Sequence, residues 1–406
     1  MRFNRLALTL YICTVSSFVW SNDNISLEIQ ELRNKLEQLE KKAQLQHQQL
    51  EEIKMVRGEA STISQPKLKF DIKPYGFIRA DAAYHFQGSD KIFNKINTVP
   101  LDDSPQSVNG RTLFNVNASR FGLDFQTDVE NQKLSGKLEV DFRGGSDQDQ
   151  LRIRHAYVKV NNWILGQTTS PFVSADILPE MVDFLANVGG GVQRNPMVQY
   201  QHKFDQNIMS SFALEDGSNS RNIDDKTRLP AFTSKTQFKS DDGKSTFNVR
   251  TLALQKKTSA DDAIAWGVGL GGIYNLNDEN KFHADYYHVR GDNKFMLFAN
   301  DAYVLNADKQ IVENEYDSLA LGWTHKWSSQ WRSTLGVGVM QAHDGSEYVR
   351  LLPTANESLY QGWLNLFYAP NKSLTYALEY VHGERTTFAG KEGTDSRFET
   401  MVRYAF

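Results

Sequence analysis

The chain has 406 residues, of which 49 are acidic and 45 basic, so its formal net charge is −4 and nothing in its charge favours nucleic-acid binding. Aromatic residues make up 12% of the sequence, yet no segment beyond the N-terminal region approaches the roughly 20 consecutive apolar residues of a membrane helix, which excludes a helical membrane protein. A β-barrel is compatible with this composition because its strands carry apolar residues only at alternate positions.

Residues 1–21 are predicted to be a secretory signal peptide. Arg2 and Arg5 precede an apolar run that ends near Trp20 and is too short for a membrane span. The single cysteine, Cys13, lies within this segment. We therefore expect an exported protein whose mature chain has no disulfide, no thiol nucleophile and no cysteine-ligated metal.

Residues 22–57 are predicted to form a periplasmic α-helical coiled coil. Their opposite face is almost entirely Glu, Lys and Gln. The seam of heptad positions consists of Ile25, Ile29, Leu32, Leu36, Leu39, Ala43, Gln46, Leu50 and Ile53. A seam sustained for about four heptads favours association with other copies of the helix, and the alternative is an amphipathic helix packed on its own domain. Residues 58–69 are small and polar and are expected to be a linker.

The rest of the chain, residues 70–406, is predicted to be a transmembrane β-barrel porin domain. Apolar and polar side chains alternate along short segments, and in the first of these Ile72 and Ile78 lie on one face and Arg79 on the other. A period of two indicates strands with one apolar and one polar face, as in a membrane barrel with lipid outside and water inside.

The last ten residues, RFETMVRYAF, show the same alternation. Phe398, Val402 and Phe406 fall on one face, and Arg397 and Arg403 fall on the other. A final strand that ends on Phe is typical of bacterial outer-membrane barrels, whose assembly machinery recognises a terminal aromatic residue. We therefore expect the outer-membrane lipid and that machinery as partners.

The number of strands follows from the connections between alternating segments. Short turns are expected at residues 128, 161–162, 205–206, 240–243, 277–280, 328–330 and 370–372. Longer polar connections are expected at residues 87–110, 144–150, 168–195, 216–230, 256–262, 291–315, 343–356 and 385–396. Seven short and eight long connections in alternation predict an all-β fold, an antiparallel barrel of 16 strands with both termini at the short-turn, periplasmic end.

The chain resembles the DcaP-like porins, relatives of the phosphate-selective porins. The resemblance lies in YGFIRADAAYHF, NASRFGLDF, LRIRHAYVKV, GQTTSPFVSADILPEMVDF and the terminal RYAF. It covers essentially the whole mature chain. It implies a homotrimer of barrels in the bacterial outer membrane that passes small anionic solutes, with dicarboxylates preferred.

Residues 168–190 are predicted to fold inward and narrow the pore. Pro171 and Pro179 disfavour regular pairing, and a wide barrel needs narrowing by a loop. The acids Asp176, Glu180 and Asp183 are expected to face the opposite wall. Alternatively, the segment caps the barrel from outside.

Inward-facing arginines are predicted to bind the solute. The candidates are Arg79, Arg120, Arg143, Arg152, Arg154 and Arg194. Guanidinium groups match two oxygens of a carboxylate or phosphate, and a ring of them selects anions. The alternative is wall bracing, because Asp81, Asp124, Glu139 and Asp141 lie on the same strands.

The strand LRIRHAYVKV does not show a clear inner face. Arg152 and Arg154 share their parity with Ala156, Val158 and Val160. A strand buried between protomers, without a lipid face, would show such a pattern.

Two other functions were considered. A membrane-embedded hydrolase is disfavoured, because the histidines are spread singly and no Ser, His and acid constellation or metal-ligand spacing occurs. We therefore predict no enzymatic activity and no cofactor. The third hypothesis is a structural tether with a non-selective pore.

Overall fold

The structure is a computed structural model. It describes residues 34–35, 37–38, 41–42, 44–45, 71–88, 91–107, 109–129, 132–145, 149–218 and 225–406. The chain divides into two compact units, Met1–Leu68 and Lys69–Phe406. In the first unit the described residues are helical and exposed. The predicted signal peptide, the linker and most of the predicted coiled coil lie outside the described residues.

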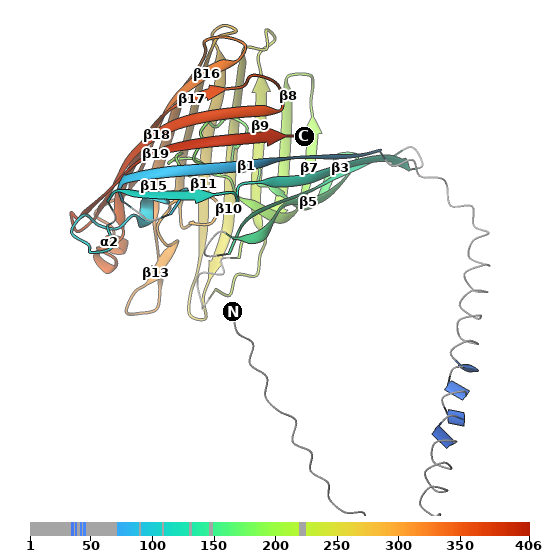
Figure 1. Ribbon diagram of the computed structural model, residues 1–406. Helices are drawn as coiled ribbons and strands as arrows, with labels where there is room; N and C mark the ends of the chain where they lie inside the picture. The colour runs from blue at the N-terminus through green and yellow to red at the C-terminus, as the bar shows by residue number, and fades with distance from the viewer. Residues whose placement is uncertain are drawn as a thin grey trace, which may run out of the picture. The chain divides into compact units, whose positions relative to one another are not determined.

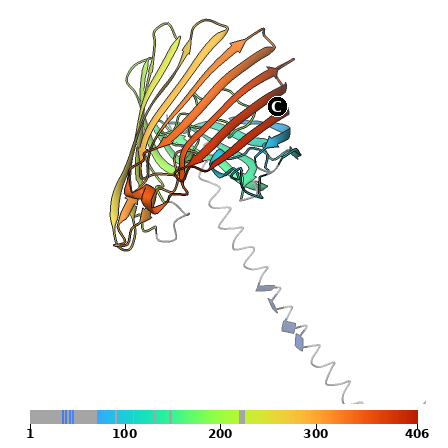
Figure 2. The same cartoon turned by 90° about the vertical axis from the view of Figure 1, so that its left-hand side faces the viewer.

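The second unit is a closed antiparallel β-barrel (Figures 1 and 2). Its strands are β1 (Asp71–Gln87), β2 (Arg111–Asn115), β3 (Arg120–Val129), β4 (Gln132–Gly144), β5 (Gln150–Val160), β6 (Trp163–Thr169), β7 (Arg194–Lys203), β8 (Ile208–Glu215), β9 (Ala231–Lys239), β10 (Ser245–Lys257), β11 (Asp262–Asn275), β12 (Asn280–Arg290), β15 (Glu315–Lys326), β16 (Trp331–Ala342), β17 (Asn356–Tyr368), β18 (Leu374–Thr387) and β19 (Glu392–Ala405). The long connections add η1 (Ile96–Thr98), the hairpin β13 (Tyr303–Leu305) and β14 (Ile311–Glu313), and α2 (Glu347–Leu351). No helix among the described residues has the length and apolarity needed to cross a membrane.

The predicted number of strands is confirmed. The barrel sheet contains 17 strand segments. Both β2 and β3 pair with β1, through Ala83 opposite Leu113 and Phe77 opposite Arg120, so they share one position in the wall and leave 16 positions. The ring closes where β1 pairs with β19.

Five of the seven predicted turns fall between strands, while residue 128 lies near the end of β3 and the turn at 277–280 reaches the first residue of β12. One predicted long connection is much shorter than expected. Residues 385–396 were expected to form a loop, but β18 continues to Thr387 and β19 begins at Glu392. Arg385 pairs with Gly393 in this extension. The strands therefore continue as a hairpin beyond the region where apolar residues alternate.

Alternation places apolar side chains outside and polar side chains inside. On β19, Phe398 and Val402 are exposed on the outer face, whereas Arg397 and Glu399 are buried inside. The chain end closes the wall, because Phe406 N–H donates to the carbonyl oxygen of Gly76 (3.1 Å) and Gly76 N–H donates back (3.2 Å).

A β-bulge explains the ambiguous strand β5. Glu139 of β4 pairs with His155, while its neighbour Val140 pairs with Ile153, so Arg154 is an extra residue. A bulge reverses the parity of the strand. Arg154 therefore faces inward on one side of the bulge, and Lys159 faces inward on the other, where it donates to Gln201 (2.7 Å).

Candidate functional site: a loop and a basic wall inside the barrel

The long connection between β6 and β7, residues 170–193, lies inside the barrel. Ser174 N–H donates to Tyr287 Oη (3.3 Å), and the carbonyl oxygen of Ile177 lies 2.8 Å from His283 Nδ1, both on the inner face of β12. The buried ring of Phe172 lies 5.5 Å from the Tyr287 ring. This half of the loop is therefore packed against the wall, not above it.

The second half of the loop continues around the wall to β1. Val182 N–H and Asp183 N–H both donate to the carboxylate of Glu379 on β18, at 2.8 and 2.7 Å. Arg79 Nη2 of β1 donates to the carbonyl oxygen of Val182 (2.6 Å). Buried backbone groups that leave regular pairing need such partners, and here the wall supplies them.

Two glycines allow the loop backbone to touch the wall backbone. A Cβ atom on Gly338 of β16 would lie 1.9 Å from the carbonyl oxygen of Val188. Gly189 has φ +84°, and Ser318 Oγ of β15 donates to its carbonyl oxygen (3.3 Å). At both glycines the loop backbone lies so close to the wall backbone that a side chain would not fit between them.

Among the described residues, none of the three acids of the loop forms a salt bridge with a predicted arginine. Their partners are Lys235 Nζ for Asp176 (2.7 Å), Arg332 Nε for Glu180 (2.6 Å) and Arg397 for Asp183. Although burial alone would raise it, the pKa of Asp176 is lowered by the ammonium group of Lys235. The expectation that these acids face the opposite wall is wrong, because each is paired with a base on a strand that the loop itself covers.

Asp183 belongs to a buried group of four charged side chains. The guanidinium of Arg397 contacts Asp183 and Asp395 and lies 2.8 Å from Glu399 Oε1. All four side chains are at most 2% exposed. This group fixes the loop to β19 and is shielded from water.

Two of the predicted arginines hold the loop. Arg79 is 3% exposed, pairs with Asp81 (2.6 Å) and lies 4.3 Å from the ring centre of Phe184. Arg143 lies 4.4 Å from the ring centre of Phe93 and 5.2 Å from that of Phe184. These contacts match the bracing alternative.

The other four predicted arginines come together on one wall. Arg154 Nε donates to Glu139 Oε1 (2.6 Å), and Arg120 Nε lies 3.6 Å from the same oxygen. Arg152 forms a two-point contact with Asp141, at 2.8 and 2.6 Å, and Arg154 Nη1 shares that carboxylate (3.0 Å). Four guanidinium groups thus surround two carboxylates when Arg194 is included. We call Arg120, Arg152, Arg154 and Arg194 the basic cluster.

Arg194 differs from the rest of the basic cluster. Its Nε lies 3.4 Å from His155 Nε2, and its Nη1 lies 3.4 Å from the carbonyl oxygen of Val192. Within the part of the chain that the structure describes, no carboxylate lies within salt-bridge distance of it. Arg152 is the most exposed of the three that pair with acids, with 40% of its side chain accessible.

Sequence reasoning missed the basic partners of the loop and one further arginine. Arg403 of β19 faces inward, 5.7 Å from the ring centre of Phe77, and Arg120 lies 5.1 Å from the same ring. Lys235, Arg332 and Arg403 all lie at positions that alternation assigns to the inner face. The sequence therefore indicates their inward orientation, but alternation alone does not identify which inward bases contact the loop.

The comparisons with known proteins agree with this architecture. The family model described as DcaP outer membrane protein matches residues 17–406. The crystal structure of the outer membrane channel DcaP of Acinetobacter baumannii matches with 37% sequence identity and a TM-score of 0.79, over 83% of this chain and 97% of that one. An anion-selective porin from Comamonas acidovorans shares the fold at 11% identity and a TM-score of 0.58, over 83% of this chain and 100% of that one.

The search of curated proteins gives no match. The family match spans nearly the whole sequence, and the relative of 37% identity is a channel. The chain therefore belongs to the DcaP outer membrane protein family and is a bacterial outer-membrane channel, not an enzyme.

Proposed function

We propose that this channel passes small hydrophilic anions, with dicarboxylates preferred, and that the basic cluster is its selectivity element. The supporting observation is the ratio of charges on that wall, where four guanidinium groups surround the carboxylates of Glu139 and Asp141. A positive surface in a confined pore favours anions through its field.

The loop determines which wall the solute meets. Most of its contacts are with β9, β10, β12, β15 to β19 and β1, whereas it meets β8 only near its start, at Ser170, and β4 through the Phe184 ring. We therefore expect the water-filled path to run along β3 to β7. The basic cluster lies on β3, β5 and β7. A dicarboxylate moving along this path would replace part of its hydration water with hydrogen bonds from the guanidinium groups of Arg152 and Arg194.

Attraction must stay modest for conduction, since a tightly held anion would block the pore. Shared carboxylates provide this limit, because Glu139 and Asp141 offset part of the positive charge of the basic cluster.

We further propose that the barrel assembles as a homotrimer and that residues 22–57 form a coiled coil in the periplasm. Both proposals depend on the resemblance to DcaP porins and on the heptad seam.

The test is the reversal potential of Arg194→Ala in a salt gradient across a planar bilayer. A unit charge about 4 Å from an ion in water contributes about 1 kcal/mol, so the anion preference should fall about fivefold at 0.1 M salt or below. The effect should shrink at 1 M salt, where the Debye length is about 3 Å.

The matched control is Arg290→Ala. Arg290 lies on the outer face and pairs with Glu313 (2.9 Å), so its removal changes the net charge equally without touching the lumen. Unchanged selectivity in Arg194→Ala, Arg152→Ala and their combination would assign the basic cluster to wall bracing. A wild-type channel without anion preference would favour the structural tether.

A further inference from the structure

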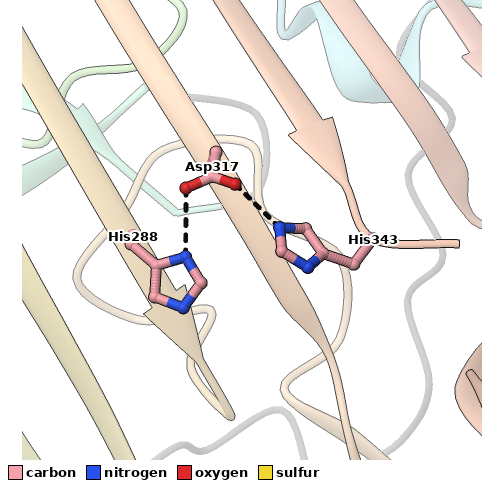
Figure 3. A group of neighbouring side chains, drawn as sticks. All are labelled: His288, Asp317 and His343. Carbon is pink, nitrogen blue, oxygen red and sulfur yellow. Dashed lines mark hydrogen bonds and ion pairs between the residues drawn. The ribbon is translucent and has the colours of Figure 1, made fainter.

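A group of histidine and acid side chains lies on the outer face of the barrel, at the end that carries the long connections. Figure 3 shows His288 of β12, Asp317 of β15 and His343, which follows β16, with both rings turned toward the carboxylate. His288 and Asp317 are direct partners in the β12–β15 ladder, and His343 N–H donates to the carbonyl oxygen of Glu315 (2.8 Å).

This placement separates the group from the solute path. On β12 and β15 the inner face carries Tyr287 and Ser318, which are buried. His288 and Asp317 are their immediate neighbours in sequence and lie on the opposite face. Whatever binds here approaches from outside the barrel.

The ligand atoms lie close enough together for a metal ion to bind after a small rearrangement. His288 Nδ1 lies 3.0 Å from Asp317 Oδ1, and His343 Nε2 lies 2.7 Å from Asp317 Oδ2. The candidate ligand atoms of the three residues all lie within 4.8 Å of one another. In a tetrahedral zinc site with bonds of 2.0–2.1 Å, neighbouring ligand atoms are roughly 3.3 Å apart.

Glu315 adds the support that metal-bound histidines require. Its Oε1 lies 3.5 Å from His288 Nε2 and 3.5 Å from His343 Nδ1, the ring nitrogens that do not face Asp317. A histidine that binds a metal through one nitrogen usually donates the other N–H to a carboxylate. One acid is therefore placed to bind the ion, and the other is placed to orient both rings.

The charge of the group favours a cation. Over the described ranges of the chain, neither Asp317 nor Glu315 has a Lys or Arg within salt-bridge distance, and their ionic partners are the two histidines. The two carboxylates therefore have no described Lys or Arg as a direct ion-pair partner, although Arg290 lies opposite Glu315 in the β12–β15 ladder. Arg290, which is nearby on β12, is paired with Glu313.

The candidate metal ligands are accessible to an ion and are held in place by neighbouring side chains. The side chains of Asp317 and His343 are 37% and 42% exposed, so an ion can reach them from water. Tyr286 Oη donates to Asp317 Oδ1 (2.6 Å), and the Trp266 ring lies 5.1 Å from that of His288. These contacts hold the ligands in place before the ion arrives.

We propose that His288, Asp317 and His343 form a surface site for a divalent transition-metal ion of the zinc class, with Glu315 as the positioning residue. The bound ion would join three neighbouring wall positions, β12, β15 and the end of β16, on the membrane-facing side of the rim. The site would stabilise the barrel without entering the solute path.

The experiment uses the full-length mature protein, without a histidine tag, in detergent. Zn²⁺ binding is measured by isothermal titration calorimetry at pH 7.5, and Co²⁺ is used as a spectroscopic probe of tetrahedral coordination. We expect one ion per protomer and at least tenfold weaker binding in His343→Ala and Asp317→Asn. Glu315→Gln should keep the stoichiometry and weaken binding roughly tenfold.

The control is His202→Ala, which removes another outward-facing histidine, one that packs on the rings of Tyr200 and Phe204 and should leave binding unchanged. Zn²⁺ should also raise the temperature of heat modification in the wild type but not in His343→Ala. Heat-modifiable migration in metal-free buffer confirms that each variant is folded. The proposal is overturned if wild-type protein binds no Zn²⁺ at millimolar concentration, or if folded His288→Ala and His343→Ala bind it as the wild type does.

Discussion

Replacing Gly338 with alanine tests whether the loop defines the pore. The added Cβ atom would lie 1.9 Å from the carbonyl oxygen of Val188 and 2.7 Å from its carbonyl carbon. An ordinary contact begins near 3.4 Å, so the loop backbone must move about 1.5 Å away from β16. Since β16 is the wall and the loop lies on its inner face, the displacement is directed into the lumen.

We expect a smaller single-channel conductance in Gly338→Ala and a loss of about 1–3 kcal/mol in stability, the usual cost of overpacking. Conductance should be measured at 1 M salt, where charge effects are screened and the cross-section dominates. Gly362→Ala is the matched control, because a Cβ atom there would lie no closer than 3.2 Å to the Tyr360 hydroxyl oxygen and 3.6 Å to the carbonyl oxygen of Gly336. A correctly inserted Gly338→Ala channel with wild-type conductance would show that the loop does not bound the conduction path.

Four further outcomes are expected. Glu139→Gln should increase anion preference in reversal-potential measurements, because it removes a negative charge from the wall, and a decrease would contradict the charge argument. Deleting Phe406 should lower the surface level of the barrel, because the hydrogen bonds to Gly76 that close the wall are lost; normal levels would count against it. Removing residues 22–64 should leave a conducting channel, since the barrel is a separate compact unit, and an inserted but silent truncation would contradict this. Because the pKa of Asp176 is lowered below its ordinary value near 4, its ion pair with Lys235 persists above that value and is lost only as the pH falls through the lowered pKa, so the effect of Asp176→Asn on conductance should be the same at pH 7 and pH 4.

Much of the fold could be predicted because the lipid imposes a simple rule on the sequence. Every spanning strand must show apolar residues outside and must end near a turn, so alternation and turn residues together give the strand positions. This rule applies only to the parts of the strands whose outer face is in contact with lipid. In the last part of β18 the outer face carries polar residues, such as His382 and Glu384, so the apolar alternation ends before the strand does. A polar segment containing Arg385 therefore has the composition of a loop although it is part of the strand.

The bulge in β5 shows a second limit. Parity counting assumes an unbroken period of two, and one extra residue at Arg154 reverses it. The sequence shows this reversal, because polar residues occupy even-numbered positions up to Arg154 and odd-numbered positions from His155 onward. A bulge is a local explanation that requires no neighbouring protomer.

The pairing of the loop acids could not be predicted from the sequence. The partners of Asp176, Glu180 and Asp183 lie 59, 152 and 214 positions away. Periodicity describes which face a residue occupies but not which strand a loop will reach. The same argument explains why six inward arginines divided into two groups, since only the path of the loop separates Arg79 and Arg143 from the basic cluster.

This division implies that shape and charge are controlled separately. The water-exposed acids of the loop, Asp176 and Glu180, are each paired with a base, so the loop narrows the lumen without adding an unpaired charge to its surface. Among the described residues, the basic cluster supplies charge but forms no hydrogen bond or ion pair with Val188 and Gly189, which seat the loop at Gly338. The free-energy effects of mutations at two sites that share no contact partners usually add. The double variant Gly338→Ala and Arg194→Ala should therefore combine the conductance of one parent with the selectivity of the other, and strong coupling between the two would mean that the loop position itself sets the field at the basic wall.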